Sequence, residues 1–409
     1  MKKLIEKLIS VRKIKSSPSF SYPLLSSGFS NSDLKAGIEV LLSGQLTMSH
    51  LTKKFEKYFA KKIGTKYALM VNSGSSANLL SFFCITNPKR KNFLKKGDEC
   101  LVPALCWSTS LWPVLQSGLK PVLVDVNKYN FCLDLKTIKK NVTKKTKAIL
   151  IVNVLGNCSE LDKIRKFTSD KQILLVEDNC ESLGSIYKGK NLGTFGDFSS
   201  FSFYYSHQVT SGEGGMVVCK NKNDYEILKS LRAHGWDRDL KKKSNKNDFN
   251  FINEGFNLRP LEVSAAIGHN QFLRLEKFKK KRSINRKILI NALEGSKFWK
   301  NQFEFFHPNK YLKPSWFGLP LMISNKLKYK KQMFLKYLNK NKVETRPIIS
   351  GNFSNQPSIK LFGIKYKKRE LINTQDIEDR GFFIGLPTEV IQKKTVERLV
   401  RLLLDITNL

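Results

Sequence analysis

The sequence predicts an α/β protein with a large domain on a mostly parallel sheet and a smaller C-terminal α/β domain. Between about residues 66 and 219, short β-branched apolar runs alternate with helix-like segments, a pattern typical of a sheet covered on both faces. The 409 residues are also enough for two domains. We therefore expect an N-terminal extension over residues 1–30, a large domain over 31–275 and a small domain over 276–409.

The expected elements of the large domain follow one another as βα units. Its predicted strands are Tyr67–Val71, Cys100–Val102, Pro121–Val124, Ala148–Val152 and Ile173–Val176. The predicted helices between them are Ser76–Cys84, Ser108–Gln116 and Leu161–Thr168. An aromatic, β-rich segment over residues 198–206 follows, and it breaks into a polar, Gly-rich turn at His207.

A long helical pattern beginning at Pro260 then leads towards the C-terminal part. Its apolar residues recur at helical spacing while its Lys and Arg residues face away, so we expect one helix that bridges the two domains. The small domain is predicted to contain the strands Leu319–Ile323 and Val343–Ile349 and the helices Lys328–Leu338 and Thr395–Leu404.

The formal net charge of +38 suggests nucleic acid as a partner, but the distribution of the charge argues against it. Lysines are scattered over the chain, as in the Lys-rich loop near residues 241–249, without a basic helix or stripe. We interpret them as general surface residues and expect no nucleic-acid partner. A second interpretation is that the positive field attracts a small anionic substrate such as a nucleotide-sugar diphosphate.

The chain also lacks the patterns of membrane and disulfide-stapled proteins. No apolar run approaches the ~18 residues of a membrane span, so no membrane partner is expected. Residues 1–15 mix charged with apolar residues and are interpreted as an amphipathic lead-in to a cytoplasmic protein. The seven cysteines form no CxxC pair and are expected to be reduced and mostly buried.

Polar segments follow several of the predicted strands and make up a candidate site. The segment NSGSSAN, residues 72–78, opens a helix, and helix N-termini bind phosphates, although Ser and Gly there can also be a simple N-cap. Trp107 follows another strand and could stack on a planar ring or simply pack. Asp178, at the end of an apolar strand, needs a cationic partner such as a protonated pyridine, or else caps a helix. A lone histidine such as His207 is more often structural than catalytic.

Together the motifs MVNSGSSAN, VPALCWSTS, VEDNCESLGS and EGFNLRP, in this order, resemble the DegT/StrS sugar aminotransferase family. The resemblance covers nearly the whole chain and implies the fold-type-I architecture of pyridoxal phosphate (PLP) enzymes. It also implies a homodimer, because Asn257 lies in the motif that reaches the cofactor phosphate of the neighbouring subunit. The other implied cofactor contacts are the phosphate site at Gly74, Ser75, Ser76 and Ser202, the pyridine nitrogen at Asp178, ring stacking at Trp107, and the ring hydroxyl at Glu181, where the family usually has Gln.

Position 207 departs from the family pattern. Family aminotransferases have a lysine there that bonds covalently to PLP, which an imidazole cannot do, so PLP or pyridoxamine phosphate (PMP) should be held noncovalently. A histidine in this context resembles the branch of nucleotide 4-keto-6-deoxyhexose 3-dehydratases, which act in deoxysugar and surface polysaccharide biosynthesis. Arg346, in a segment similar to one of that branch, is a candidate for binding the sugar nucleotide or a co-substrate carboxylate, or else forms a structural salt bridge.

Within that branch, some enzymes carry a 2Fe–2S cluster and others use none and regain the amine from glutamate. No cysteine follows Cys219, so we expect no cluster, no metal site and L-glutamate as amino donor. With an ordinary pKa near 6.5, His207 could remove a proton and then return it to the leaving C3 hydroxyl. An ordinary nucleotide-sugar aminotransferase and a noncatalytic PLP-binding relative remain the alternatives.

Overall fold

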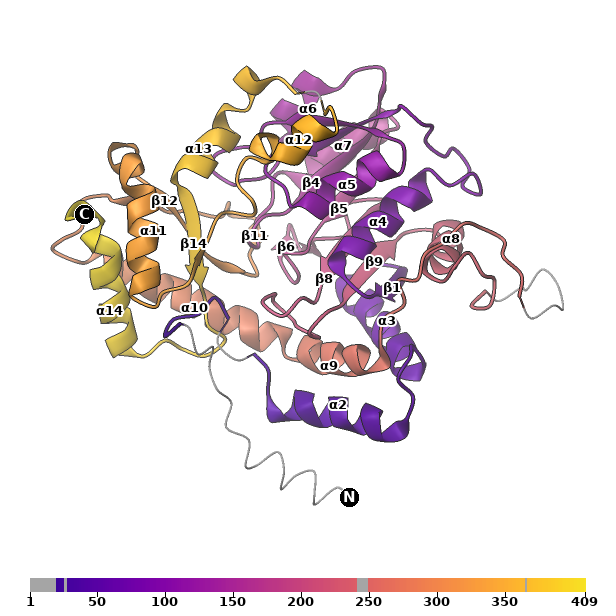
Figure 1. Ribbon diagram of the computed structural model, residues 1–409, viewed down its shortest axis with the longest axis horizontal. Helices are drawn as coiled ribbons and strands as arrows, with labels where there is room; N and C mark the ends of the chain where they lie inside the picture. The colour runs from indigo at the N-terminus through magenta and orange to yellow at the C-terminus, as the bar shows by residue number, and fades with distance from the viewer. Residues whose placement is uncertain (1–19, 26–27, 241–248, 365) are drawn as a thin grey trace.

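The computed structural model describes residues 20–25, 28–240, 249–364 and 366–409. The expected amphipathic lead-in and residues 241–248 of the Lys-rich loop lie outside these ranges. Figure 1 shows two helix-covered sheets next to each other, with a long helix, α10 (Leu275–Glu294), running from one to the other along the lower side.

The larger sheet has seven strands in the order β1-β9-β8-β5-β4-β2-β3. Every neighbouring pair is parallel except those made by β9, which is antiparallel to both β1 and β8. The predicted, mostly parallel sheet is therefore confirmed. Its strands are β1 Tyr67–Val71, β2 Glu99–Pro103, β3 Lys120–Val124, β4 Thr146–Val152, β5 Leu174–Asp178, β8 Phe198–Ser202 and β9 Gly215–Cys219.

Helices cover both faces of this sheet. Along β1, successive side chains pack alternately into the core on one face and the core on the other. Leu69 and Val71 belong to the main core cluster, whereas Ala68 and Met70 belong to the cluster on the opposite face. Because both faces are buried, the strands read as continuous apolar runs. The covering helices are α3 His50–Ile63, α4 Gly74–Ile85, α5 Ser108–Gln116, α6 Leu135–Asn141, α7 Leu161–Asp170, α8 Lys222–Arg232 and α9 Glu262–Leu273. Before them, α2 (Asn31–Ser43) packs against α9.

The C-terminal part is built on a four-stranded antiparallel sheet in the order β10-β12-β14-β13. Its strands are β10 Phe303–Glu304, β12 Gly318–Ile323, β13 Thr345–Arg346 and β14 Gly381–Gly385. Its other helices are α11 Lys331–Lys340, α12 Pro357–Leu361, α13 Ile372–Arg380 and α14 Lys393–Leu404. The short 3-10 turns are η1 Asn325–Lys330, η2 Phe353–Asn355, η3 Lys368–Glu370 and η4 Asp405–Thr407.

A third, three-stranded sheet pairs a segment of the C-terminal part with the large one. In it β11 (Leu312–Lys313) pairs with β6 (Ile186–Tyr187), which forms a hairpin with β7 (Lys190–Asn191). The two parts are thus joined by backbone hydrogen bonds as well as by α10. The domain limits at residues 30 and 275 stay predictions.

Two predicted elements differ from the structure. The single long helix is two helices, α9 and α10, that meet at Arg274, whose guanidinium pairs with the buried carboxylate of Asp33 at 2.5 Å. The predicted strand Val343–Ile349 shortens to β13, because Pro347 cannot donate to a ladder and Ile349 has a φ of +51°.

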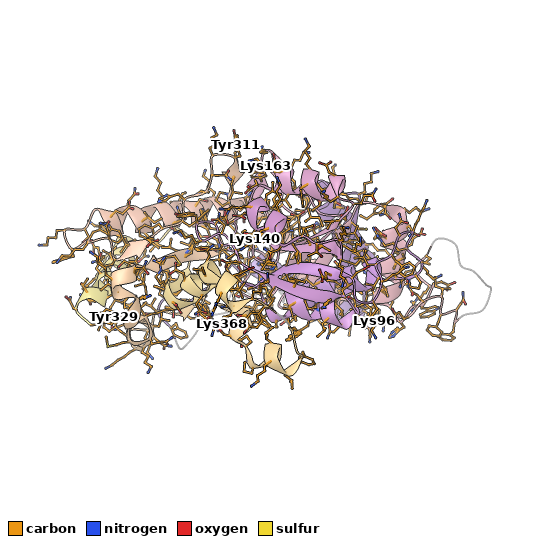
Figure 2. All side chains as sticks on the ribbon, turned by 90° about the horizontal axis from the view of Figure 1, so that it is seen from above. Lys96, Lys140, Lys163, Tyr311, Tyr329 and Lys368 are labelled. Atoms are coloured by element: carbon orange, nitrogen blue, oxygen red, sulfur yellow. The ribbon has the colours of Figure 1, made fainter. Side chains whose placement is uncertain are left out.

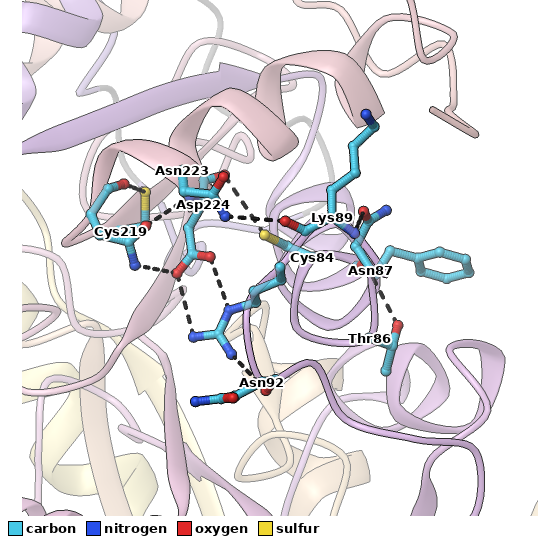
Figure 3. Close-up of polar contacts among 11 residues, drawn as sticks. Cys84, Thr86, Asn87, Lys89, Asn92, Cys219, Asn223 and Asp224 are labelled. Atoms are coloured by element: carbon cyan, nitrogen blue, oxygen red, sulfur yellow. Dashed lines mark hydrogen bonds and ion pairs between the residues drawn. The ribbon is translucent and has the colours of Figure 1, made fainter. Parts of the chain in front are cut away.

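Polar side chains pin α8 to the end of α4 (Figure 3). Asp224 receives Arg90 Nε at 2.9 Å on its carboxylate, and its main-chain oxygen accepts the Cys84 thiol at 3.6 Å. Asn221 caps α8 by accepting from Asp224 N at 2.8 Å. All seven cysteines are free thiols, and six of them are buried, as predicted. Cys84 is thus part of the packing at this corner.

Exposed lysines lie on many separate elements, among them Lys96, Lys140, Lys163 and Lys368, which Figure 2 labels. These four lie before β2, on α6, on α7 and in η3, respectively. Their spread over the surface fits the interpretation as general surface residues. Within the described ranges, no helix is both long and apolar enough to cross a membrane.

Candidate active site

A pocket of about 820 Å³ lies at the carboxyl ends of the parallel strands. Ligands of α/β proteins bind at this edge, because the loops that leave parallel strands meet there. The C-terminal part closes the other side with Phe317, Glu344, Arg346 and Phe383. The predicted site residues that line it are Gly74, Ser75, Trp107, Asp178, Glu181, Ser202, His207 and Arg346.

One corner of the pocket is the N-terminus of α4. Ser73 caps this helix by accepting from Ser76 N at 3.1 Å, and Ser75 Oγ lies 2.8 Å from Thr109 Oγ1. A Cβ at position 74 would lie 2.6 Å from the Cβ of Ser202, so only glycine allows β8 to approach this closely. Free N–H groups and hydroxyls at a helix N-terminus form a site for a phosphate.

Asp178 lies at the end of β5 and is only 4% exposed. Its Oδ2 accepts from Asn78 Nδ2 at 2.7 Å and from Ser110 Oγ at 2.8 Å, while Oδ1 accepts from Cys180 N at 3.1 Å. Donors on α4, on α5 and in the following loop therefore fix the carboxylate. Sequence reasoning did not single out Asn78 and Ser110, although Asn78 lies one helical turn after Gly74 in the same motif.

Glu181 borders the pocket three residues further on. Its Oε2 accepts from Leu155 N at 3.1 Å. Burial raises the pKa of this carboxyl to about 7; the Leu155 N–H opposes the shift and the negative charge of Asp178 adds to it. At neutral pH Glu181 can therefore act as either a hydrogen-bond donor or an acceptor.

His207 lies in the loop between β8 and β9. Its ring meets Tyr204 and Phe317 edge to face, with centroids 5.6 and 5.1 Å away. Its Nδ1 is buried and has no hydrogen-bond partner among the described residues. Burial and then the positive charge of Arg282 lower the pKa of His207 to about 3. The ordinary pKa near 6.5 therefore does not apply at this site, because the sequence shows neither the burial of the ring nor the charge of Arg282.

Trp107 and Arg346 lie at the mouth of the pocket. Trp107 is 57% exposed, which excludes a purely packing role for the indole and leaves it free to stack on a ligand. Arg346 lines the pocket and its guanidinium pairs with Glu344 at 3.1 Å, so the predicted salt bridge is present and the substrate-binding role stays a prediction. Glu344 also accepts from Leu24 N at 3.0 Å.

Two predicted residues do not line this pocket. Ser76 is buried and its Oγ donates to Asn72 Oδ1 at 2.6 Å, so it stabilises the loop between β1 and α4. Asn257 is exposed and accepts from Arg259 Nε at 3.1 Å. A contact of Asn257 with a cofactor phosphate therefore requires a second copy of the chain.

The N-terminal segment is a pocket component that sequence reasoning missed. Pro23, Leu24 and Leu25 line the pocket, although residues 1–30 were expected to be an extension. Tyr22 anchors the segment by pairing with Val343 in a parallel bridge and by donating its hydroxyl to Gly385 O at 2.9 Å. The sequence of this segment has no motif that predicts its role, because the role depends on its contacts with the small sheet.

These residues fit a bound PLP or PMP. The corner at Gly74 suits the phosphate, the Asp178 carboxylate suits a protonated pyridine nitrogen, and Trp107 offers a free aromatic face. No lysine is among the described residues that line the pocket. Lys188 lies in the β6–β7 hairpin, where it pairs with Asp162 at 2.6 Å, so it does not replace the family lysine.

Comparison with known proteins identifies the family of the chain. The sequence model of the DegT/DnrJ/EryC1/StrS aminotransferase family matches residues 29–403. The GDP-4-keto-6-deoxy-D-mannose 3-dehydratase of Escherichia coli O55:H7 is 37% identical over 89% of this chain and 95% of its own length.

Two solved structures of a GDP-4-keto-6-deoxymannose 3-dehydratase are also similar. A mutant with bound GDP-perosamine superposes with a TM-score of 0.87 at 36% identity, covering 94% of this chain and 100% of the other. A form with a trapped PLP-glutamate geminal diamine has a TM-score of 0.86 at 35% identity, with the same coverage. The predicted resemblance and the fold-type-I architecture are confirmed, and the chain belongs to the DegT/DnrJ/EryC1/StrS aminotransferase family.

Proposed function

We propose that this chain is a PLP/PMP-dependent dehydratase that removes the C3 hydroxyl of a nucleotide-linked 4-keto-6-deoxyhexose, with L-glutamate as amino donor. The observation that carries the proposal is the imidazole of His207, held neutral in a pocket that has the family's cofactor-binding residues and no lysine among its described lining. The 37% identical relative of that name and the neighbours with bound GDP-perosamine and a PLP-glutamate adduct support it.

The cofactor, when bound, supplies an amine that joins the C4 ketone and a ring that accepts electrons. Asp178 keeps the pyridine nitrogen protonated. His207, neutral at physiological pH, accepts a proton as the general base. Because the pocket lowers its pKa, the resulting imidazolium is a strong acid and delivers the proton to the departing C3 hydroxyl. Because no lysine is among the described residues that line the pocket, water would release the product: its oxygen becomes the C4 ketone and the nitrogen leaves as ammonia.

The same proposal includes the partners. The mouth of the pocket offers Arg346 for the anionic part of a sugar nucleotide or for the carboxylate of glutamate, and Trp107 for ring stacking. Asn257 is exposed and is not among the residues that line the pocket of its own chain, which supports a homodimer with shared active sites. A cytoplasmic location and the absence of an iron–sulfur cluster remain predictions from the sequence.

The test incubates purified protein with PLP, glutamate and a panel of nucleotide 4-keto-6-deoxyhexoses. We expect 2-oxoglutarate, ammonia and a 3,6-dideoxy-4-keto sugar. A 4-amino sugar as product would instead identify an aminotransferase, and PLP binding without turnover would identify a noncatalytic relative.

Borohydride treatment tests the cofactor linkage separately. Because no lysine lines the described pocket, reduction should leave the cofactor extractable. A stable adduct on a lysine, located by peptide mass spectrometry, would contradict the proposal.

A further inference from the structure

His207 lacks the partner that usually orients a histidine base. Such a base commonly donates its second ring nitrogen to a carboxylate or a carbonyl, which fixes the ring. Here Nδ1 has no hydrogen-bond partner among the described residues; the ring meets those of Tyr204 and Phe317 at steep angles, and the Tyr204 backbone, which raises the pKa of His207, is the hydrogen-bonding group beside it. The position of the imidazole must therefore come from the way its loop is anchored.

The next residue, Gln208, provides such an anchor. Its side chain is 2% exposed, and its Nε2 donates both to the main-chain oxygen of Glu181 and to that of Ser315, the latter at 3.2 Å. Because both partners are carbonyl oxygens, which only accept, the NH₂ group of the Gln208 amide must point towards them. Glu181 follows β5 of the large sheet, whereas Ser315 precedes β12 of the small sheet.

These contacts close a ring of hydrogen bonds below the pocket. Glu181 Oε2 accepts from Leu155 N at 3.1 Å, and Leu155 O accepts from Phe317 N at 3.4 Å. The backbone connects Phe317 to Ser315, and the main-chain oxygen of Ser315 accepts from Gln208 Nε2, which closes the ring. Phe317 also packs against the imidazole of His207. The same closed set of contacts therefore holds the His207 loop and the aromatic side chain that packs against His207.

The segment Ser315–Phe317 is itself tightly held. Ser315 N donates to Ser185 Oγ at 2.8 Å, and a Cβ at Gly156 would lie only 2.4 Å from Ser315 O. The guanidinium of Arg282 donates to Trp316 O at 3.3 Å. Gln208 therefore ties the His207 loop to a rigid part of the interface between the two sheets.

We propose that Gln208 is the positioning residue of His207. Its amide fixes the position of the imidazole by donating both to the loop after β5 of the large sheet and to the segment before β12 of the small sheet. This inference rests on the proposed function for the role of His207. Gln208 contacts neither the ligand-facing side of the pocket nor the His207 ring, so it acts through the backbone of its neighbour.

The test compares Gln208→Met, which keeps the length of the side chain and removes its donor, with Gln302→Met as the matched control. Gln302 is 1% exposed and donates to Phe298 O at 2.9 Å, but it lies outside the pocket. Both variants lose a buried amide, so both lose stability. Hydrogen exchange of the cofactor-free proteins should be faster over residues 204–212 in Gln208→Met only.

Kinetics of the loaded enzyme provide the second measurement. We expect kcat of Gln208→Met to fall by about 10- to 100-fold with KM for the sugar nucleotide unchanged, because a base displaced by about 1 Å loses rate without loss of binding. Gln208→Asn, which keeps a shorter amide, should be intermediate, and it replaces Gln208→Met if that variant does not fold.

Unchanged exchange over residues 204–212, or a fall in kcat that Gln302→Met shares, would overturn the proposal. If the wild-type protein dehydrates none of the sugars, the proposed function fails. The exchange comparison on cofactor-free protein then decides the anchoring role of Gln208 by itself.

Discussion

The two walls of the pocket are held in different ways. The wall around Asp178 comes from regular elements of the large sheet, and three donors fix its carboxylate within 3.1 Å. The other wall is a composite of the His207 loop, Phe317 of the C-terminal part and the N-terminal residues Pro23–Leu25. A cofactor site can thus be preorganised by one sheet, while the base depends on how the two sheets meet.

Loss of the base from the composite wall should lower the reaction rate more than any other change. His207→Asn keeps a polar side chain but no base, so kcat should fall by about 10²- to 10⁴-fold. The absorbance of bound PLP should persist, because the cofactor contacts lie on the other wall. Loss of PLP together with activity would show that the two walls are not separable.

On the regular wall, Asp178→Asn should weaken both cofactor binding and turnover. The amide cannot balance a protonated pyridine nitrogen, so we expect a loss in kcat on the order of 10²-fold. Ser110→Ala, which removes one of the two donors on Oδ2, is the graded control and should cost less. PLP retained after dialysis, measured by absorbance, distinguishes a binding defect from a chemical one.

Arg282 tests whether a remote charge keeps the base neutral. Removing its positive charge by Arg282→Met favours the imidazolium, so the pKa of His207 should rise. The acid limb of the kcat profile should then move to higher pH, with a severalfold lower rate at acid pH. Arg286→Met, one turn along α10, is the control and should leave the profile in place.

The smallest effect concerns stability. The pKa of His207 is lowered from 6.5 to about 3, so its contribution is present above pH 6.5 and is lost as pH falls towards 3. The pKa of Glu181 is raised from 4.5 to about 7, so its contribution is present below pH 4.5 and is lost as pH rises towards 7. The two slopes, each at most about 1.4 kcal/mol per pH unit, oppose each other between pH 4.5 and 6.5.

Single variants should separate these slopes in denaturant unfolding. Relative to the wild type, the free energy of unfolding of His207→Asn should fall with rising pH over that range, and that of Glu181→Gln should rise. Parallel curves for the wild type and both variants would exclude such shifted pKa values.

By itself the sequence predicted the parallel strands of the large sheet and the residues that follow them, but not the antiparallel strand β9. Ser75, Trp107, Asp178 and His207 could be grouped in advance, because the motifs around them, in their order, resemble those of one enzyme family. The tertiary structure alone decided the low pKa of His207, the break at Arg274 and the place of Pro23–Leu25 in the pocket. Each of these depends on segments far apart in the chain, and burial or charge at such contacts leaves no local pattern in the sequence. The amide of Gln208 joins the two levels, because it lies next to the predicted base while its partners are known only from the fold.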